Sequence, residues 1–198
     1  MRLDDDDFAL LGLPRRFRLD AAALATRWRD LQSRVHPDRF AAEGAAAQRL
    51  AMQWAVRVNE AHHRLKDPLT RASYLCELAG HAVQNRDSEP VPADVLARQM
   101  QWHETLADAT STDAVTALDA EVAARLKEVH DAVANDLDVR HDVRATVPRL
   151  REWMFLARLR EQIEQRLERL ETEPGPGERV ADSTESGEGP AACKSVGW

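Results

Sequence analysis

The chain has 198 residues with a formal net charge of −7, and its 43% of apolar residues can build one elongated domain or two small ones. The acidic balance disfavours nucleic acid as the main partner, and no apolar run approaches the length that crosses a membrane. Few aromatic residues and no alternating runs of Val, Ile or Thr predict an all-α protein.

The first predicted helix is short and starts at Phe8, directly after the aspartates of residues 4–7. Their carboxylates favour the positive end of the helix dipole. Gly12 and Pro14 end this helix. Asp20 is the predicted N-cap of the helix that follows.

Two predicted helices then form an antiparallel hairpin, because their apolar residues recur with the period of helices that pack along a seam. His36, Pro37 and Asp38 lie between the two helices. Since Pro37 has no N–H and biases His36 away from the helical region, the first helix must end there and the three residues occupy the tip of the hairpin. The two apolar stripes are Leu24, Trp28, Leu31 and Val35, then Ala47, Ala51, Trp54, Val58, Ala61 and Leu65.

Charge is unevenly placed along the chain. Arg27 and Arg34 are seven residues apart on the first hairpin helix and therefore share nearly one face. Residues 15–40 hold seven Arg against three Asp, a balance of +4, whereas residues 89–137 hold ten acidic against three basic residues, a balance of −7. One end is thus basic and the other acidic, although two solvated helix faces would give the same pattern.

A fourth helix follows, with Asp67 as its predicted cap, Pro68 as its first residue and Gly80 as its terminator. Cys76 lies on the apolar face of this helix and is predicted to be a small core residue rather than a nucleophile. Cys193 is far away in the sequence, so the two cysteines build neither a disulfide framework nor a metal knuckle, which fits a reducing cytosol.

The chain divides into four predicted parts. We expect a first helical unit over residues 1–80, a connector over 81–91, a three-helix bundle over 92–172 and a disordered tail over 173–198. Short connections within the bundle favour an up-down arrangement. Its predicted helices cover about 92–108, 112–137 and 144–171.

Three apolar residues do not fit the core stripes of this bundle. Leu96 and Met100 lie well round the first bundle helix from the stripe that contains Trp102. Phe155 lies off the stripe of the third helix, among charged residues. Either the core is wider than these stripes, or the three residues form a partner surface.

Three motifs occur in a telling order and spacing. Residues 8–14 read FALLGLP, residues 36–40 read HPDRF, and residues 58–75 read VNEAHHRLKDPLTRASYL. Together they resemble the HscB family, the DnaJ-type cochaperones dedicated to iron–sulfur cluster assembly, over about residues 4–171. A lone His-Pro-Asp recurs by chance, but inside a helical hairpin and followed by Asp-Pro-Leu-x-Arg-Ala it is specific.

The resemblance implies an L-shaped cochaperone whose amino-terminal DnaJ-like domain binds an HscA/DnaK-class chaperone and stimulates its ATP hydrolysis. The carboxy-terminal bundle would hold IscU, the scaffold on which clusters are made. The triad His36, Pro37 and Asp38, with Arg27 and Arg34, would face the chaperone. No catalytic residue, metal or cofactor is implied. The implied scaffold-binding residues are Leu96, Ala97, Met100, Gln101, Glu104, Asp108 and Phe155.

Two departures from the family pattern stand out. Ala97 and Gln101 replace the larger apolar residue and the acid expected there, which puts the affinity for the scaffold in question. The Cys-rich zinc segment of eukaryotic relatives and a mitochondrial presequence are missing, and the aspartates at residues 4–7 are unlike a basic targeting peptide. We therefore expect a bacterial, cytoplasmic protein without a membrane partner.

Two other classes of protein compete with this interpretation. An enzyme could use His36 as a base oriented by Asp38, but the chain has no His-Glu-x-x-His, no Gly-rich phosphate loop and no Gly-x-Ser-x-Gly. A general DnaJ-type cochaperone for other clients would carry a Gly/Phe linker or a cysteine-rich zinc module after its first domain, and neither occurs.

Overall fold

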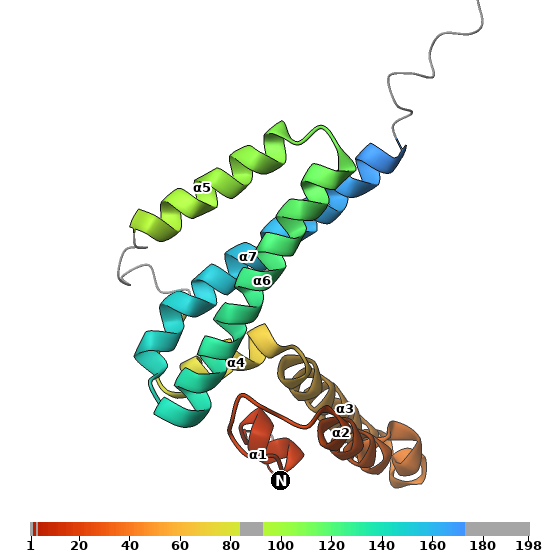
Figure 1. Ribbon diagram of the computed structural model, residues 1–198. Helices are drawn as coiled ribbons and strands as arrows, with labels where there is room; N and C mark the ends of the chain where they lie inside the picture. Colours follow the sequence, from red (N-terminus) through yellow and green to blue (C-terminus); the bar gives the residue numbers. More distant parts are fainter. Residues whose placement is uncertain (1, 3, 84–92, 173–198) are drawn as a thin grey trace, which may run out of the picture.

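The computed structural model describes residues 2, 4–83 and 93–172. Figure 1 shows an L-shaped arrangement in which the long α6 and α7 form one arm and the α2–α3 hairpin forms the other. All regular elements of the described residues are helical, which confirms the prediction of an all-α protein. Their bounds are α1 (Asp7–Leu11), α2 (Ala21–Val35), 3-10 helix η1 (Pro37–Glu43), α3 (Ala45–Lys66), α4 (Pro68–Leu78), α5 (Ala93–Asp108), α6 (Thr112–Asn135), π-helix η2 (Asp136–Arg140) and α7 (Val143–Thr172).

Parts of the chain lie outside this description. The predicted tail, 173–198, is one of them, and so is the predicted connector from residue 84 onward. Within the described ranges, no helix combines the length and the apolar character needed to cross a lipid bilayer.

Local sequence signals set the predicted helix ends. The carboxylate of Asp20 accepts hydrogen bonds from the backbone N–H groups of Ala22 and Ala23 at 2.8 and 3.3 Å, so it caps α2 as expected. α2 ends at Val35, two residues before Pro37. Asp67 accepts from the N–H of Thr70 at 2.7 Å and caps α4. These confirmed ends place the triad at the turn between the hairpin helices.

The amino-terminal unit has its own core between α1, α2 and α3. The predicted seam residues supply most of it, since Leu24, Val58 and Leu65 are all buried. α1 adds an apolar face that closes this core. The buried members are Phe8, Leu10, Leu11, Leu24, Leu31, Val58, Ala61 and Leu65.

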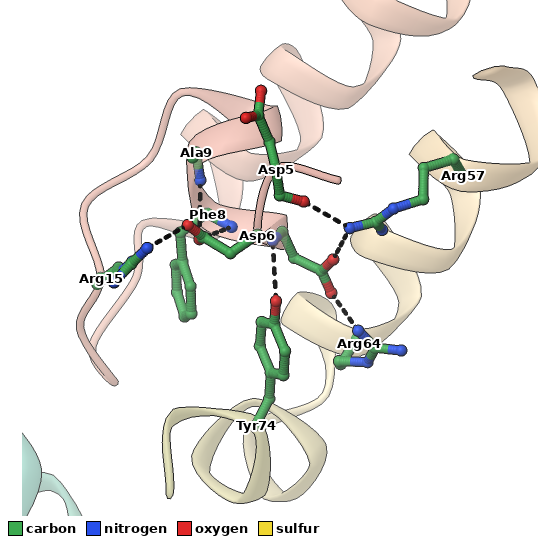
Figure 2. Close-up of polar contacts among 9 residues, drawn as sticks. Asp5, Asp6, Phe8, Ala9, Arg15, Arg57, Arg64 and Tyr74 are labelled. Atoms are coloured by element: carbon green, nitrogen blue, oxygen red, sulfur yellow. Dashed lines mark hydrogen bonds and ion pairs between the residues drawn. The ribbon is translucent and has the colours of Figure 1, made fainter. Parts of the chain in front are cut away.

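Asp7 ties α1 to α3 through a buried ion pair, whereas the sequence suggested only a dipole interaction for it. Its side chain is 0% exposed, with Oδ1 2.6 Å from Nη2 of Arg57 and Oδ2 2.9 Å from Nη1 of Arg64. Its backbone N–H donates to the hydroxyl of Tyr74 at 3.1 Å. Figure 2 shows Arg57, Arg64 and Tyr74 converging on this point from two helices. The start of the chain is thereby fixed to the hairpin.

Asp6, beside it, is the N-cap of α1 and accepts from the N–H groups of Phe8 and Ala9, both at 3.1 Å. Burial alone would raise the pKa of this carboxyl, but the hydrogen bond from Arg15 and those from the backbone lower it overall. Because the pKa is lowered on folding, this carboxylate stabilises the fold at neutral pH, and that contribution is lost as the pH falls through the folded-state pKa. Figure 2 shows the Arg15 contact.

The bundle is built on the long α6–α7 pair, with α5 alongside it (Figure 1). Trp102 brings α5 into the core, where its side chain is 3% exposed. Its indole N–H donates to Oε1 of Glu121 on α6 at 2.8 Å. The deepest bundle residues are Val115, Val122, Val133, Leu150, Leu156, Leu159 and Ile163.

The turn between α6 and α7 differs from the prediction, which continued the α-helix to residue 137. The α-helix ends at Asn135, and the π-helical turn η2 follows. This turn buries the carboxylate of Asp136, whose oxygens lie 2.7 Å from Nε of Arg149 and 3.3 Å from Nη1 of Arg140. His141 then closes the turn with a φ of 53°. The spacing of apolar residues could not reveal this turn, because the turn is specified by the buried carboxylate of Asp136 and its arginine partners.

The two arms meet at an elbow formed around Phe17. Its side chain is 1% exposed and belongs to the bundle core, although it comes from the loop between α1 and α2. Both carboxylate oxygens of Asp138 accept from this loop, at 2.6 Å from the N–H of Phe17 and at 2.8 Å from that of Arg18. The buried guanidinium of Arg71 donates to the carbonyl of Phe17 at 2.7 Å. The elbow therefore buries an apolar ring and also gives hydrogen-bond partners to the backbone groups beside it.

We predict that Asp138→Ala lowers the free energy of unfolding by about 1–2 kcal/mol, because two backbone N–H groups of the elbow lose their acceptor. Urea denaturation followed by circular dichroism measures the change. Asp30→Ala is the matched control, because Asp30 is exposed on α2. An Asp138→Ala protein as stable as the control would contradict the structural role of this carboxylate.

Candidate functional site

The triad is displayed at the tip of the hairpin rather than packed into it. His36 ends α2 in an extended conformation, and its Nδ1 accepts from the N–H of Asp38 at a long 3.3 Å. The side chains of His36 and Asp38 are 56% and 89% exposed, and Nδ1 of His36 lies 3.5 Å from Oδ2 of Asp38. An exposed carboxylate beside a proline-fixed turn can accept charge-assisted hydrogen bonds from another molecule.

Arg27 and Arg34 extend this display along α2. Both side chains are exposed, and neither forms an ion pair with any residue that the structure describes. Neighbouring arginines behave differently, since Arg29 donates to the carbonyl of Ala25 and Arg39 donates to that of Ser33. Arg27 and Arg34 are thus positive charges available to a partner.

The second predicted surface lies on α5. Leu96 and Met100 are 50% and 57% exposed, so the wider core that would have buried them is wrong for these two residues. Phe155 is half-buried and packs against the bundle core while also lying next to α5. The exposed polar and small members of the predicted set share the helix with the apolar pair. They are Ala97, Gln101, Glu104 and Asp108.

The structure brings the predicted residues together as two separate groups. The triad and its arginines lie at the end of the hairpin, and the α5 set with Phe155 lies on the bundle. Figure 1 shows α5 and the hairpin in different arms of the L.

The described part of the chain holds little that could act as a nucleophile or bind a metal ion. Cys76 is fully buried, and burial raises the pKa of its thiol to about 12, so the thiol stays protonated at neutral pH. No three His, Cys, Asp or Glu side chains of the described residues lie where they could hold a metal ion. Burial against Trp28 and the nearby His63 and Lys66 lower the pKa of His62, which makes it a neutral stacking partner.

Sequence reasoning missed the residues that hold the site in place. Asp138, Arg71 and Asp7 act through contacts between segments far apart in the chain, and no periodic pattern marks such contacts. One signal was available, namely Phe17, a single aromatic residue in an arginine-rich loop. An aromatic side chain in such a loop needs an apolar neighbour.

Comparison with known proteins adds to this geometry. Residues 91–164 match the family described as the HSCB C-terminal oligomerisation domain. The chain is 45% identical over 160 residues to the Co-chaperone protein HscB homolog of Bordetella petrii, covering 80% of this chain and 94% of that protein. It is 41% identical over 173 residues to the homolog of Aromatoleum aromaticum, covering 86% and 98%.

Solved structures agree. Chaperone HscB from Vibrio cholerae superposes with a TM-score of 0.72 at 32% identity, covering 84% of this chain and 99% of that one. Human co-chaperone protein HscB superposes with a TM-score of 0.77 at 28% identity, covering 83% of each chain. The shared architecture and sequence place this chain in the class of co-chaperone proteins. Identity over nearly the whole length of its relatives then shows that the chain belongs to the HscB family.

Proposed function

We propose that this chain binds an IscU-type iron–sulfur scaffold protein, delivers it to an HscA/DnaK-class chaperone and stimulates that chaperone's ATP hydrolysis. We assign chaperone binding to residues 1–80 and scaffold binding to the bundle, 92–172, in the cytoplasm of a bacterium. The observation that carries the proposal is that the exposed triad and the exposed apolar pair of α5 occupy separate arms of one protein.

The chaperone side has a physical rationale in charge. Asp38 can accept hydrogen bonds from an arginine of the chaperone, and the fixed turn at Pro37 holds the carboxylate in place for that contact. Arg27 and Arg34 suit an acidic groove, whose attraction speeds encounter and sets the register of binding. The groups that hydrolyse ATP would belong to the chaperone.

The scaffold side has a rationale in burial. Covering an exposed Leu or Met contributes up to about 1.5–3 kcal/mol, so Leu96 and Met100 can supply much of the affinity for an apolar patch. The carboxylates of Glu104 and Asp108 lie one and two turns beyond Met100 and suit basic residues around that patch. Ala97 and Gln101 offer less apolar area and less charge than the family pattern.

A steady-state ATPase assay with the cognate chaperone tests the proposal. We expect this protein to raise phosphate release, and to raise it further when the scaffold protein is present. An unfolded polypeptide in place of the scaffold separates the general DnaJ-type alternative, which would require it to serve equally well. Phosphate release at the basal rate under saturating scaffold would contradict the proposed function.

A further inference from the structure

Two adjacent residues of α5 hold the ring of Phe155. The indole of Trp102 lies nearly parallel to that ring, with centroids 6.4 Å apart and an interplanar angle of 16°. The imidazole of His103 meets it edge-on, with centroids 5.4 Å apart and an angle of 81°. Trp102 is itself fixed, because it is buried and its N–H donates to Glu121. The α7 contribution to the proposed scaffold surface is therefore held by α5.

His103 differs from Trp102 because it is exposed and lies on the side of α5 that carries the proposed surface. It follows Met100 by three residues and Leu96 by seven. At about 100° per residue these spacings place His103 roughly 60° from Met100 and roughly 20° from Leu96 round the helix. Round the helix, the imidazole thus lies between the apolar pair and the side of α5 that contacts the ring of Phe155.

This placement has an energetic consequence. Leu96 and Met100 come from one helix and Phe155 from another, so a partner meets them as one surface only if the Phe155 ring keeps its position relative to α5. An edge-to-face aromatic contact can hold the ring at an energy that corresponds to about 2- to 12-fold in affinity. Loss of the imidazole would leave the ring held by Trp102 alone, so part of the binding energy would go to fixing its position.

We propose that His103 is a positioning residue of the scaffold-binding surface, acting through the ring of Phe155. The inference rests on the proposed function and adds to it a residue that the family pattern did not supply. The partner it fits is a protein with an apolar patch broad enough to cover Leu96, Met100 and Phe155 together.

Titration calorimetry of the full chain with purified IscU-type scaffold tests this. We expect His103→Ala to weaken binding by about 3- to 10-fold and Phe155→Ala to weaken it at least as much. Because His103 acts through the ring, the double variant should bind within about 2-fold of Phe155→Ala alone. His103→Phe restores an aromatic edge and should bind within about 2-fold of the unaltered protein. Thr105→Ala is the matched control, an exposed residue on the other flank of α5.

Chaperone stimulation without scaffold is expected to stay unchanged in His103→Ala, and the midpoint of thermal unfolding is expected to fall only slightly because one exposed aromatic contact is lost. A merely structural role would lower both. If the unaltered protein does not bind the scaffold, the proposed function falls and this inference with it. If the unaltered protein binds, the inference alone is overturned by any of three results. These are full affinity in His103→Ala, multiplicative losses in the double variant, or failure of His103→Phe to restore binding.

Discussion

Replacing His36 with Gln is expected to abolish stimulation of the chaperone's ATP hydrolysis while changing the free energy of unfolding by no more than about 0.5 kcal/mol. The imidazole is more than half exposed, and its contact with the N–H of Asp38 is long at 3.3 Å, so the fold depends little on it. A chaperone that binds the hairpin tip would lose its contact with the imidazole and the fixed placement of the Asp38 carboxylate. The measurement is phosphate release with the cognate chaperone, paired with thermal unfolding of the variant.

His81→Gln provides the matched control, because His81 is exposed after α4 and its backbone N–H, which donates to the carbonyl of Cys76 at 2.9 Å, is kept in the variant. It should stimulate the chaperone as the unaltered protein does. A collapse of thermal stability in His36→Gln would show that the triad is structural. Undiminished stimulation would show that the imidazole does not take part in the proposed contact.

The triple replacement of Leu96, Met100 and Phe155 with Ala is expected to weaken scaffold binding by about 100-fold. This corresponds to about 3 kcal/mol from three partly exposed apolar side chains. Stimulation of the chaperone in the absence of scaffold should persist, because the triad lies in the other arm (Figure 1). Calorimetric titration with the scaffold and an ATPase assay without it measure the two effects.

Met52→Ala with Val56→Ala is the control for this variant. Both residues are half exposed on α3, at 55% and 50%, so the double change removes exposed apolar side chains far from α5. Phe155 is half-buried and its loss costs some stability, so helicity and the unfolding midpoint of the triple variant must be checked first. Unaltered scaffold affinity in a folded triple variant would remove the assignment of this face.

Much of the fold follows from short-range chemistry and was predictable for that reason. Asp20, Pro37 and Asp67 act on residues within one helical turn of themselves, so the helix ends that they set could be read from the sequence. The burial of Cys76 followed from its apolar face. The insertion of Phe17 into the bundle depends on a contact with Asp138, more than a hundred residues away. The π-helical turn depends on the buried carboxylate of Asp136 and its arginine partners, which the apolar period does not encode.

The candidate site also contains some residues that the sequence could place and others that it could not. The phase of α5 placed Leu96 and Met100 off the core stripe but left a wider core open, and their exposure excludes that alternative for these two residues. The partial burial of Phe155 and its contact with His103 depend on how α5 lies beside α7, which a periodic pattern cannot supply. The functional roles of both groups of residues remain predictions.

The elbow fixes the two arms of the molecule at a set separation. Asp138 and Arg71 form hydrogen bonds with the backbone N–H and carbonyl of Phe17, and the ring of Phe17 is buried. Separating the two arms would therefore expose apolar surface and break these hydrogen bonds at the same time. The span between the hairpin tip and α5 is then a property of one folded body. Under the proposed function, a scaffold protein bound on α5 would be held at a distance from the chaperone that the packed helices set.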